Sequence, residues 1–140
     1  MGPSFDMSKF IETEFDLILL EGVNLIELTI EDKVFLEKFT EAKSLNLSFT
    51  GLKSLKNMPV IASLERLDIS HNNLNGEDLH VINTCFKKLK VLNVSNNEIR
   101  KLEFISHHLQ KCANMRTLDL SANPITDMNY YRKEIFESLK

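Results

Sequence analysis

The chain of 140 residues has few of the residues with which enzymes hold metals and phosphates. Its four histidines show no H-x-x-x-H spacing, and its two cysteines form no C-x-x-C motif, so we expect no metal site. With only four glycines, it contains no P-loop, no G-x-G-x-x-G and no G-x-S-x-G motif. The sequence therefore indicates a protein that is not an enzyme and that needs no cofactor.

Cysteines and charge exclude further classes of protein. Cys85 and Cys112 stand at nearly the same phase of two adjacent repeats, without a signal peptide, which predicts two buried thiols in a reducing, intracellular compartment. No apolar run approaches the roughly 20 residues that cross a bilayer. A net charge of −3 and a pI near 5.8 oppose direct binding of nucleic acid through its phosphates. We expect one monomeric domain over residues 1–140, because no linker-like stretch divides it.

What the sequence has in abundance is one repeated pattern of apolar residues. The pattern is an apolar residue, any two residues, an apolar residue, any one residue and an apolar residue. Its five copies are Leu25-Leu28-Ile30, Ala42-Leu45-Leu47, Leu64-Leu67-Ile69, Leu89-Leu92-Val94 and Met115-Leu118-Leu120. Three residues beyond each copy stand Lys33, Thr50, Asn72, Asn97 and Asn123. This is the leucine-rich repeat, L-x-x-L-x-L-x-x-N-x-L, which predicts an α/β solenoid.

The repeat also predicts how the solenoid is built. We expect a right-handed solenoid with five repeats over residues 25–126 and a parallel sheet on the concave side. Its short strands should be centred on residues 28–30, 45–47, 67–69, 92–94 and 118–120. The step from Leu28 to Leu45 is 17 residues and the later steps are 22, 25 and 26, so the first repeat is interpreted as short and irregular.

Both ends of such a solenoid need a cap, because the terminal repeats would otherwise expose their core. Residues 8–21 show an apolar stripe at helical spacing and stop at Gly22, which predicts an N-terminal cap helix. Residues 127–140 form an aromatic-rich segment, in which Tyr131, Arg132 and Phe136 are expected to build the C-terminal cap.

The asparagines of the repeat predict a buried ladder. Asn72, Asn97 and Asn123 should each bond with a side-chain amide to backbone groups of their own and a neighbouring repeat, and Thr50 can do part of this task. Lys33 cannot, because burying an unpaired ammonium is too costly, so we expect it to be exposed in the same column.

The polar residues beside the buried strand leucines are the candidate binding residues, since they should face solvent on the concave side. Acidic residues outnumber the basic one by four to one, which gives this face a charge of −3 and favours a basic protein partner. An exposed sheet must also be polar for solubility alone, which is the other interpretation of the pattern. The candidates are Glu27, Glu31, Asn46, Arg66, Asp68, Asn93 and Asp119.

Several segments of the chain are more specific than the repeat alone. They are Leu64–Asn72 (LERLDISHN), Gly76 with Cys85, Leu92–Asn97 (LNVSNN), Leu118–Ser121 (LDLS), and Asn129–Arg132 (NYYR) with Ile135 and Phe136. The spacing of Gly76 and Cys85 and the aromatic ending are the most specific of these. In these segments, and from about Leu25 to Lys140 as a whole, the chain resembles the acidic leucine-rich nuclear phosphoprotein family.

This resemblance implies a nuclear, shuttling adaptor that acts as a histone chaperone, regulates chromatin acetylation and inhibits a type-2A protein phosphatase. Two departures from the family are apparent. The first repeat is shorter than the family's, and the chain stops at Lys140, before the cap-closing Leu-Asp and the long acidic tail, so we interpret it as truncated. We expect the domain to bind a core histone through the concave face around Asp68, Asn93 and Asp119.

Two other adaptors share features with this sequence. The leucine-rich partner of a spliceosomal ribonucleoprotein binds an RNA-recognition protein, and residues 96–102 (NNEIRKL) are compatible with it. The insertion between Gly76 and Cys85 favours the nuclear phosphoprotein family instead. A cytoskeletal or motor-associated leucine-rich adaptor is the third alternative.

Overall fold

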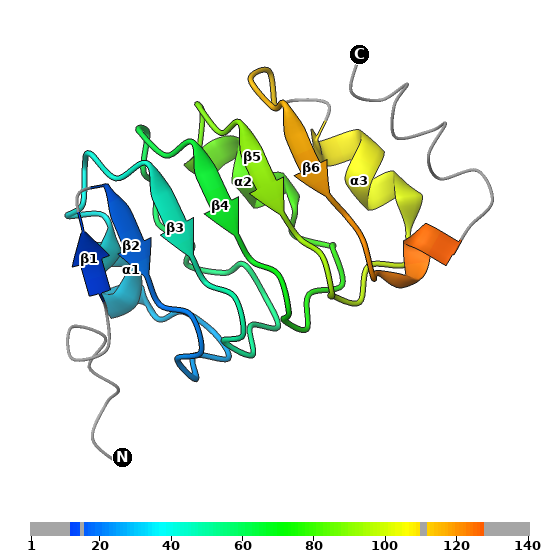
Figure 1. Ribbon diagram of the computed structural model, residues 1–140, viewed down its shortest axis with the longest axis horizontal. Helices are drawn as coiled ribbons and strands as arrows, with labels where there is room; N and C mark the ends of the chain where they lie inside the picture. The colour runs from blue at the N-terminus through cyan, green and yellow to red at the C-terminus, as the bar shows by residue number, and fades with distance from the viewer. Residues whose placement is uncertain (1–11, 15, 110–111, 128–140) are drawn as a thin grey trace.

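The computed structural model describes residues 12–14, 16–109 and 112–127 (Figure 1). Their strands form one curved sheet in chain order, and helices cover its opposite, convex side (Figure 1). β1 (Glu12–Glu14) pairs antiparallel with β2, and all later neighbours are parallel. The parallel strands are β2 (Leu17–Leu19), β3 (Ser44–Asn46), β4 (Arg66–Asp68), β5 (Val91–Asn93) and β6 (Thr117–Asp119). The predicted leucine-rich repeat solenoid with a parallel sheet is confirmed.

Helices return the chain to the next strand on the convex side. They are α1 (Ile30–Leu36), α2 (His80–Cys85) and α3 (Leu102–Leu109), and a 3-10 helix, η2 (Pro124–Asp127), follows β6. The residues that α2 buries are Ile82 and Cys85. In the described part of the chain, no helix is long and apolar enough to span a membrane.

The core lies between the sheet and the convex side, and its register follows the repeated leucines. Leu45, Leu67 and Leu92 are paired in neighbouring strands, and each is at most 1% exposed. Strands β3 to β6 each begin one residue before the three-residue range predicted for them. This shift leaves the same residues facing inward. The four corresponding predictions of strand position are therefore correct.

The predicted first strand, over residues 28–30, is wrong. Ile30 begins α1 and is 66% exposed, and Thr29 caps that helix. The Thr29 backbone N–H donates to Asp32 Oδ2 at 2.9 Å, while the Asp32 N–H donates to Thr29 Oγ1 at 3.1 Å. This reciprocal capping box favours a helix start strongly enough to override the apolar triplet. Thr-x-x-Asp was a signal in the sequence that the repeat pattern concealed.

The predicted N-terminal helix over residues 8–21 is also wrong where the structure describes it. Residues 12–14 and 17–19 are strands, and Ile18 pairs with Leu45 as the inward residue of the first repeat. The step from Ile18 to Leu45 is 27 residues, so the first repeat is of full length and is not shortened. The antiparallel β1 extends the sheet at this end. Residues 8–11 and 15 lie outside the described residues.

The structure contains the asparagine ladder. Asn72 Nδ2 donates to the carbonyls of Leu47, Ile69 and Ser70 at 3.0 to 3.1 Å, thereby bonding its own repeat and the preceding one. Its Oδ1 accepts from the N–H of Thr50 and of Leu52 at 3.0 and 3.1 Å. Asn97 and Asn123 make the corresponding Nδ2 bonds one and two repeats later, and their Oδ1 atoms accept from the N–H of Leu74 and of Ile99.

The ladder changes its chemistry towards the N-terminal end. Thr50 is 1% exposed, and its hydroxyl donates to the Leu47 carbonyl at 2.7 Å. In the first repeat, the half-buried, apolar Val23 holds this column instead. Lys33 does not lie in this column. It is part of α1, where its ammonium bonds to Glu37 Oε2 at 2.6 Å, so the prediction that it occupies the ladder column is wrong.

One residue in each repeat, directly before the ladder position, has a left-handed backbone. In this conformation the chain turns from the strand towards the core. The five residues are Gly22, Phe49, His71, Asn96 and Ala122, with φ between 54° and 79°. The predicted C-terminal cap, including Tyr131, Arg132 and Phe136, lies outside the described residues.

The ladder predicts a large loss of stability from one substitution. Asn97→Ala should lower the free energy of unfolding by at least about 2 kcal/mol, because the carbonyls of Ile69 and Val94 and the N–H of Leu74 lose buried partners. Urea denaturation measures the change. Asn73→Ala is the matched control, since Asn73 has an exposed side chain and should tolerate the change within about 0.5 kcal/mol. Equal stability of both variants would contradict the ladder's role.

The corrected register of the first repeat predicts opposite behaviour of two isoleucines. Ile18→Ala should cost about 2–5 kcal/mol, because Ile18 is 1% exposed in the core. Ile30→Ala should be nearly neutral, because that side chain is 66% exposed on α1. Thermal and urea unfolding of the two variants measure both effects. The reverse order of stabilities would restore the register first predicted from the sequence.

Candidate functional site

The concave face is built from the side chains that each strand turns away from the core. Because side chains alternate along a strand, the first and third residue of each point to the concave solvent side. The first residues form one column: Leu17, Ser44, Arg66, Val91 and Thr117. The third residues form a second column: Leu19, Asn46, Asp68, Asn93 and Asp119.

The structure brings five of the seven predicted binding residues onto this face and excludes two. Asn46, Arg66, Asp68, Asn93 and Asp119 lie in the two columns.

Glu27 and Glu31 do not belong to it. Glu27 lies in the loop before α1, and Glu31 lies in the first turn of α1, where a carboxylate suits the helix dipole. The prediction that they face the concave side is wrong for the same reason as the predicted first strand. The first repeat contributes Leu17 and Leu19 to the two columns instead. Glu21, two residues after β2, adds a carboxylate at the edge of the face, beside Ser48. The face therefore carries three acidic residues and one arginine, fewer acids than the sequence predicted.

The four polar residues of the second column have the same local structure. Asp68 Oδ1 accepts from the backbone N–H of Ser70 at 2.9 Å and from its hydroxyl at 2.6 Å. Asn46, Asn93 and Asp119 each make this pair of bonds with the serine two residues on. One oxygen of each side chain is thus fixed against its own turn, an arrangement typical of Asx turns.

The other polar atom of each of these side chains makes no hydrogen bond within the described residues. It is the Nδ2 amide in Asn46 and Asn93, and the Oδ2 oxygen in Asp68 and Asp119. Neighbouring strands lie about 4.8 Å apart, so hydrogen-bond donors and acceptors alternate along the column at that spacing. We call this set (Asn46, Asp68, Asn93, Asp119) the polar column. Because each side chain is already held, a partner that binds here orders few rotamers.

A row of charged residues runs along the opposite end of the strands, just before their first residues. Glu65 lies between two lysines, with its carboxylate 3.4 Å from Lys90 Nζ and 3.6 Å from Lys43 Nζ. The hydrogen bond from Lys90, followed by its charge, lowers the pKa of the Glu65 carboxyl. With the exposed Arg116 in the next repeat, this row is net basic. The concave face is therefore acidic at one edge and basic at the other.

Between the two edges, the sheet forms a shallow depression of about 270 Å³. Its lining comes from the four strands β2 to β5 and includes Arg66, Asp68, Val91 and Asn93. It holds no nucleophile paired with a base, and the described residues contain no group of three or more His, Cys, Asp or Glu side chains placed to hold a metal. What this geometry offers is an open docking surface.

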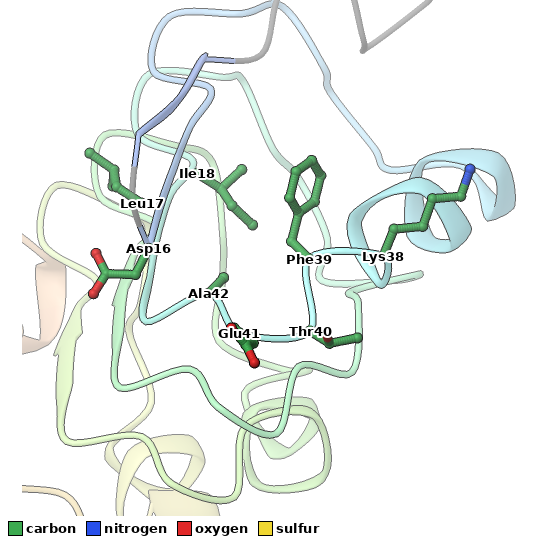
Figure 2. A pocket seen from close by; sticks show the side chains of 8 residues that line it. All are labelled: Asp16, Leu17, Ile18, Lys38, Phe39, Thr40, Glu41 and Ala42. Carbon is green, nitrogen blue, oxygen red and sulfur yellow. The ribbon is translucent and has the colours of Figure 1, made fainter.

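A second hollow lies between β2 and the turn after α1 (Figure 2). In Figure 2, Asp16 and Lys38 point to opposite sides, while Ile18 and Phe39 form an apolar wall between them. Its charged groups therefore do not converge, and it offers no arrangement for chemistry on a bound molecule.

The two cysteines are free thiols on the convex side. Cys85 is buried and Cys112 is half-buried, and burial raises the pKa of both thiols. Raising the pKa keeps a thiol protonated and unreactive at neutral pH. Cys112 donates to Asn83 Oδ1 at 2.5 Å, which links the convex turns of two neighbouring repeats.

Sequence reasoning missed one pair of residues at the edge of this surface. Phe49 is 55% exposed, and its ring stacks on His71 with centroids 4.1 Å apart and 12° between the planes. Both residues directly follow a serine that bonds to the polar column. The signal was an aromatic residue directly before a ladder position, where the other repeats have Gly22, Asn96 and Ala122.

Comparison with known proteins agrees with the geometry. A family model described as Leucine Rich Repeat matches residues 63–85, and one described as Leucine Rich repeats (2 copies) matches residues 87–133. The solved structure of the Drosophila melanogaster SNF/U2A′ complex contains a chain with the same fold. It superposes with a TM-score of 0.70 at 18% identity, over 88% of this chain and 67% of that one. The protein is thus a leucine-rich repeat domain, a class that binds other proteins.

Closer relatives define the family. A Plasmodium falciparum acidic leucine-rich nuclear phosphoprotein 32-related protein is 32% identical over 123 residues, which is 87% of this chain and 43% of the relative. The Drosophila melanogaster family member A is 32% identical over 127 residues, or 91% of this chain and 45% of the relative. Over most of its length, the chain is homologous to members of the acidic leucine-rich nuclear phosphoprotein 32 family. It spans less than half the length of these relatives.

The Asx turn that the residues of the polar column share predicts that the charge of Asp68 can be removed without loss of stability. Asp68→Asn should leave the free energy of unfolding within about 0.5 kcal/mol, since Asn46 and Asn93 make the same bonds in their repeats. Asp68→Ala should cost about 1 kcal/mol, because the Ser70 N–H and hydroxyl lose their acceptor. Urea denaturation compares the two. If Asp68→Asn were the more damaging, the carboxylate charge would have a structural role that the contacts do not indicate.

Proposed function

We propose that this domain is a non-enzymatic module that binds a basic nuclear protein, a core histone, through its concave face. The observation that carries the proposal is the polar column, which holds two carboxylates with a free oxygen each in a fixed geometry. Glu21 adds a third carboxylate at the same edge, with its Oε1 3.3 Å from Ser48 Oγ. Carboxylates held in this way attract the lysines and arginines of a basic protein.

The family supports a nuclear partner. The relatives are named nuclear phosphoproteins, and we propose that this protein is also nuclear and shuttles to the cytoplasm. Histone chaperoning and inhibition of a type-2A protein phosphatase, the two activities that the sequence resemblance implies, remain proposals for this chain. The polar column favours the first, because histones are the more basic partner.

The charge of the concave face determines how strongly the domain should bind histones. With three acids and one arginine on the concave face, binding should be weak and sensitive to salt, since exposed charges are screened beyond about 8–10 Å. A basic row of Lys43, Lys90 and Arg116 borders the opposite edge of the face. The cationic side chains of the partner should therefore contact the polar column. The basic row should contact acidic side chains of the partner or remain in solvent.

The polar column predicts a charge-dependent loss of histone binding. The double variant Asp68→Asn/Asp119→Asn should bind core histones about threefold to tenfold more weakly at low salt, because two charge pairs are lost while the turns stay intact. The difference should shrink as salt rises. Isothermal titration at two salt concentrations measures it.

The control removes the same charge elsewhere. Glu27→Gln/Glu31→Gln changes the net charge equally, but both residues lie away from the concave face, so it should bind histones as the unaltered chain does. Equal weakening in both double variants would mean that only net charge matters. If the unaltered chain binds an RNA-recognition protein or a type-2A phosphatase and no histone, the other adaptor functions replace this proposal.

A further inference from the structure

The stacked pair Phe49 and His71 is not explained by the fold. Both residues have a left-handed backbone, with φ of 57° and 54°, which is costly for a bulky side chain by about 1–2 kcal/mol. The same position is held by Gly22, Asn96 and Ala122 in the other repeats, so the turn does not need an aromatic ring. Nor does burial offset this cost, because Phe49 is 55% exposed.

One face of the Phe49 ring is covered and the other is open. His71 stacks on one face at 4.1 Å. On the other side, the residue in the same column is Gly22, whose N–H bonds to the Ser48 carbonyl just before Phe49. Gly22 has no side chain that could cover the ring, and a Cβ placed there would meet no atom within 4 Å, so the space beside Gly22 is open.

Carboxylates lie on both sides of the pair. Glu21 precedes Gly22, and its Oε1 lies 3.3 Å from the hydroxyl of Ser48, the neighbour of Phe49. Asp68 is bonded through Oδ1 to Ser70, the neighbour of His71, and its Oδ2 is available. Of these two carboxylates, Glu21 lies on the open side of the Phe49 ring. An open aromatic face with a carboxylate beside it is complementary to a flat cation.

From this arrangement we propose that Phe49 and His71, with Glu21, form a site for an arginine side chain of the partner protein. The guanidinium stacks on the open face of Phe49 and donates its N–H groups to the Glu21 carboxylate, which a lysine ammonium cannot do in one plane. The proposal rests on the proposed function, a basic protein partner, and names the residue type that it must present. The same carboxylates repel phosphates, which disfavours stacking of a nucleic-acid base.

Paired peptides test the site. A short, fluorescently labelled, glycine-rich peptide that carries arginines should bind the unaltered chain about fivefold more tightly than its counterpart with lysines, as measured by anisotropy. Phe49→Asn should abolish this preference and keep the fold, because Asn96 occupies the equivalent position. Val34→Ala, which trims an equally exposed apolar side chain on α1, should keep the preference and serves as the control.

Each outcome decides a separate question. Equal binding of both peptides, or a preference that survives Phe49→Asn, overturns the arginine site; if Asp68→Asn/Asp119→Asn still weakens histone binding, the proposed function stands. Failure of histones and of both peptides to bind overturns the proposed function itself. A single-stranded oligonucleotide that binds more tightly than either peptide, and loses binding in Phe49→Asn, would assign the rings to nucleic acid and overturn the proposal.

Discussion

The structure depends on hydrogen bonds that one buried amide makes to two successive turns. In Asn72, Asn97 and Asn123, the Nδ2 group satisfies carbonyls of its own and the preceding repeat, and Oδ1 satisfies an N–H of the preceding repeat. Without this side chain, each inward turn would bury polar backbone groups at a cost of about 1–3 kcal/mol each. The amide therefore fixes the spacing of neighbouring turns, and with it the register of the sheet.

The concave face follows from that register. Once Leu45, Leu67 and Leu92 are paired, the residues after them must form one column, and the serines two positions further must form the next. The serines fix one oxygen of each column residue and leave the other polar atom to solvent. The same repeat that stabilises the core therefore also aligns a binding surface, and no loop has to be ordered separately for it.

Most of the fold could be predicted because the repeat pattern is local and recurs. Four strands, the ladder and five of the seven proposed concave residues follow from counting along the chain. The first repeat was misplaced, because Leu25-Leu28-Ile30 also matches the strand pattern by chance, although Phe15, Ile18 and Leu20 show the same spacing. The competing signal was local too: Thr29 and Asp32 form a capping box that starts a helix. Because the first strand spans residues 17–19, Glu27 and Glu31 lie away from the concave face and Glu21 lies at its edge.

By itself, the sequence determined the class of fold, the direction in which the central leucines of β3 to β6 point, and the residues of the polar column. These depend on spacing within one repeat, which pattern and steric rules fix. Only the tertiary structure decided which residues of different repeats meet. The stacking of Phe49 on His71, the placement of Glu65 between Lys43 and Lys90, and the open space beside Gly22 all arise between repeats. Contacts of this kind depend on how far each repeat lies from the next in space, which sequence spacing does not encode.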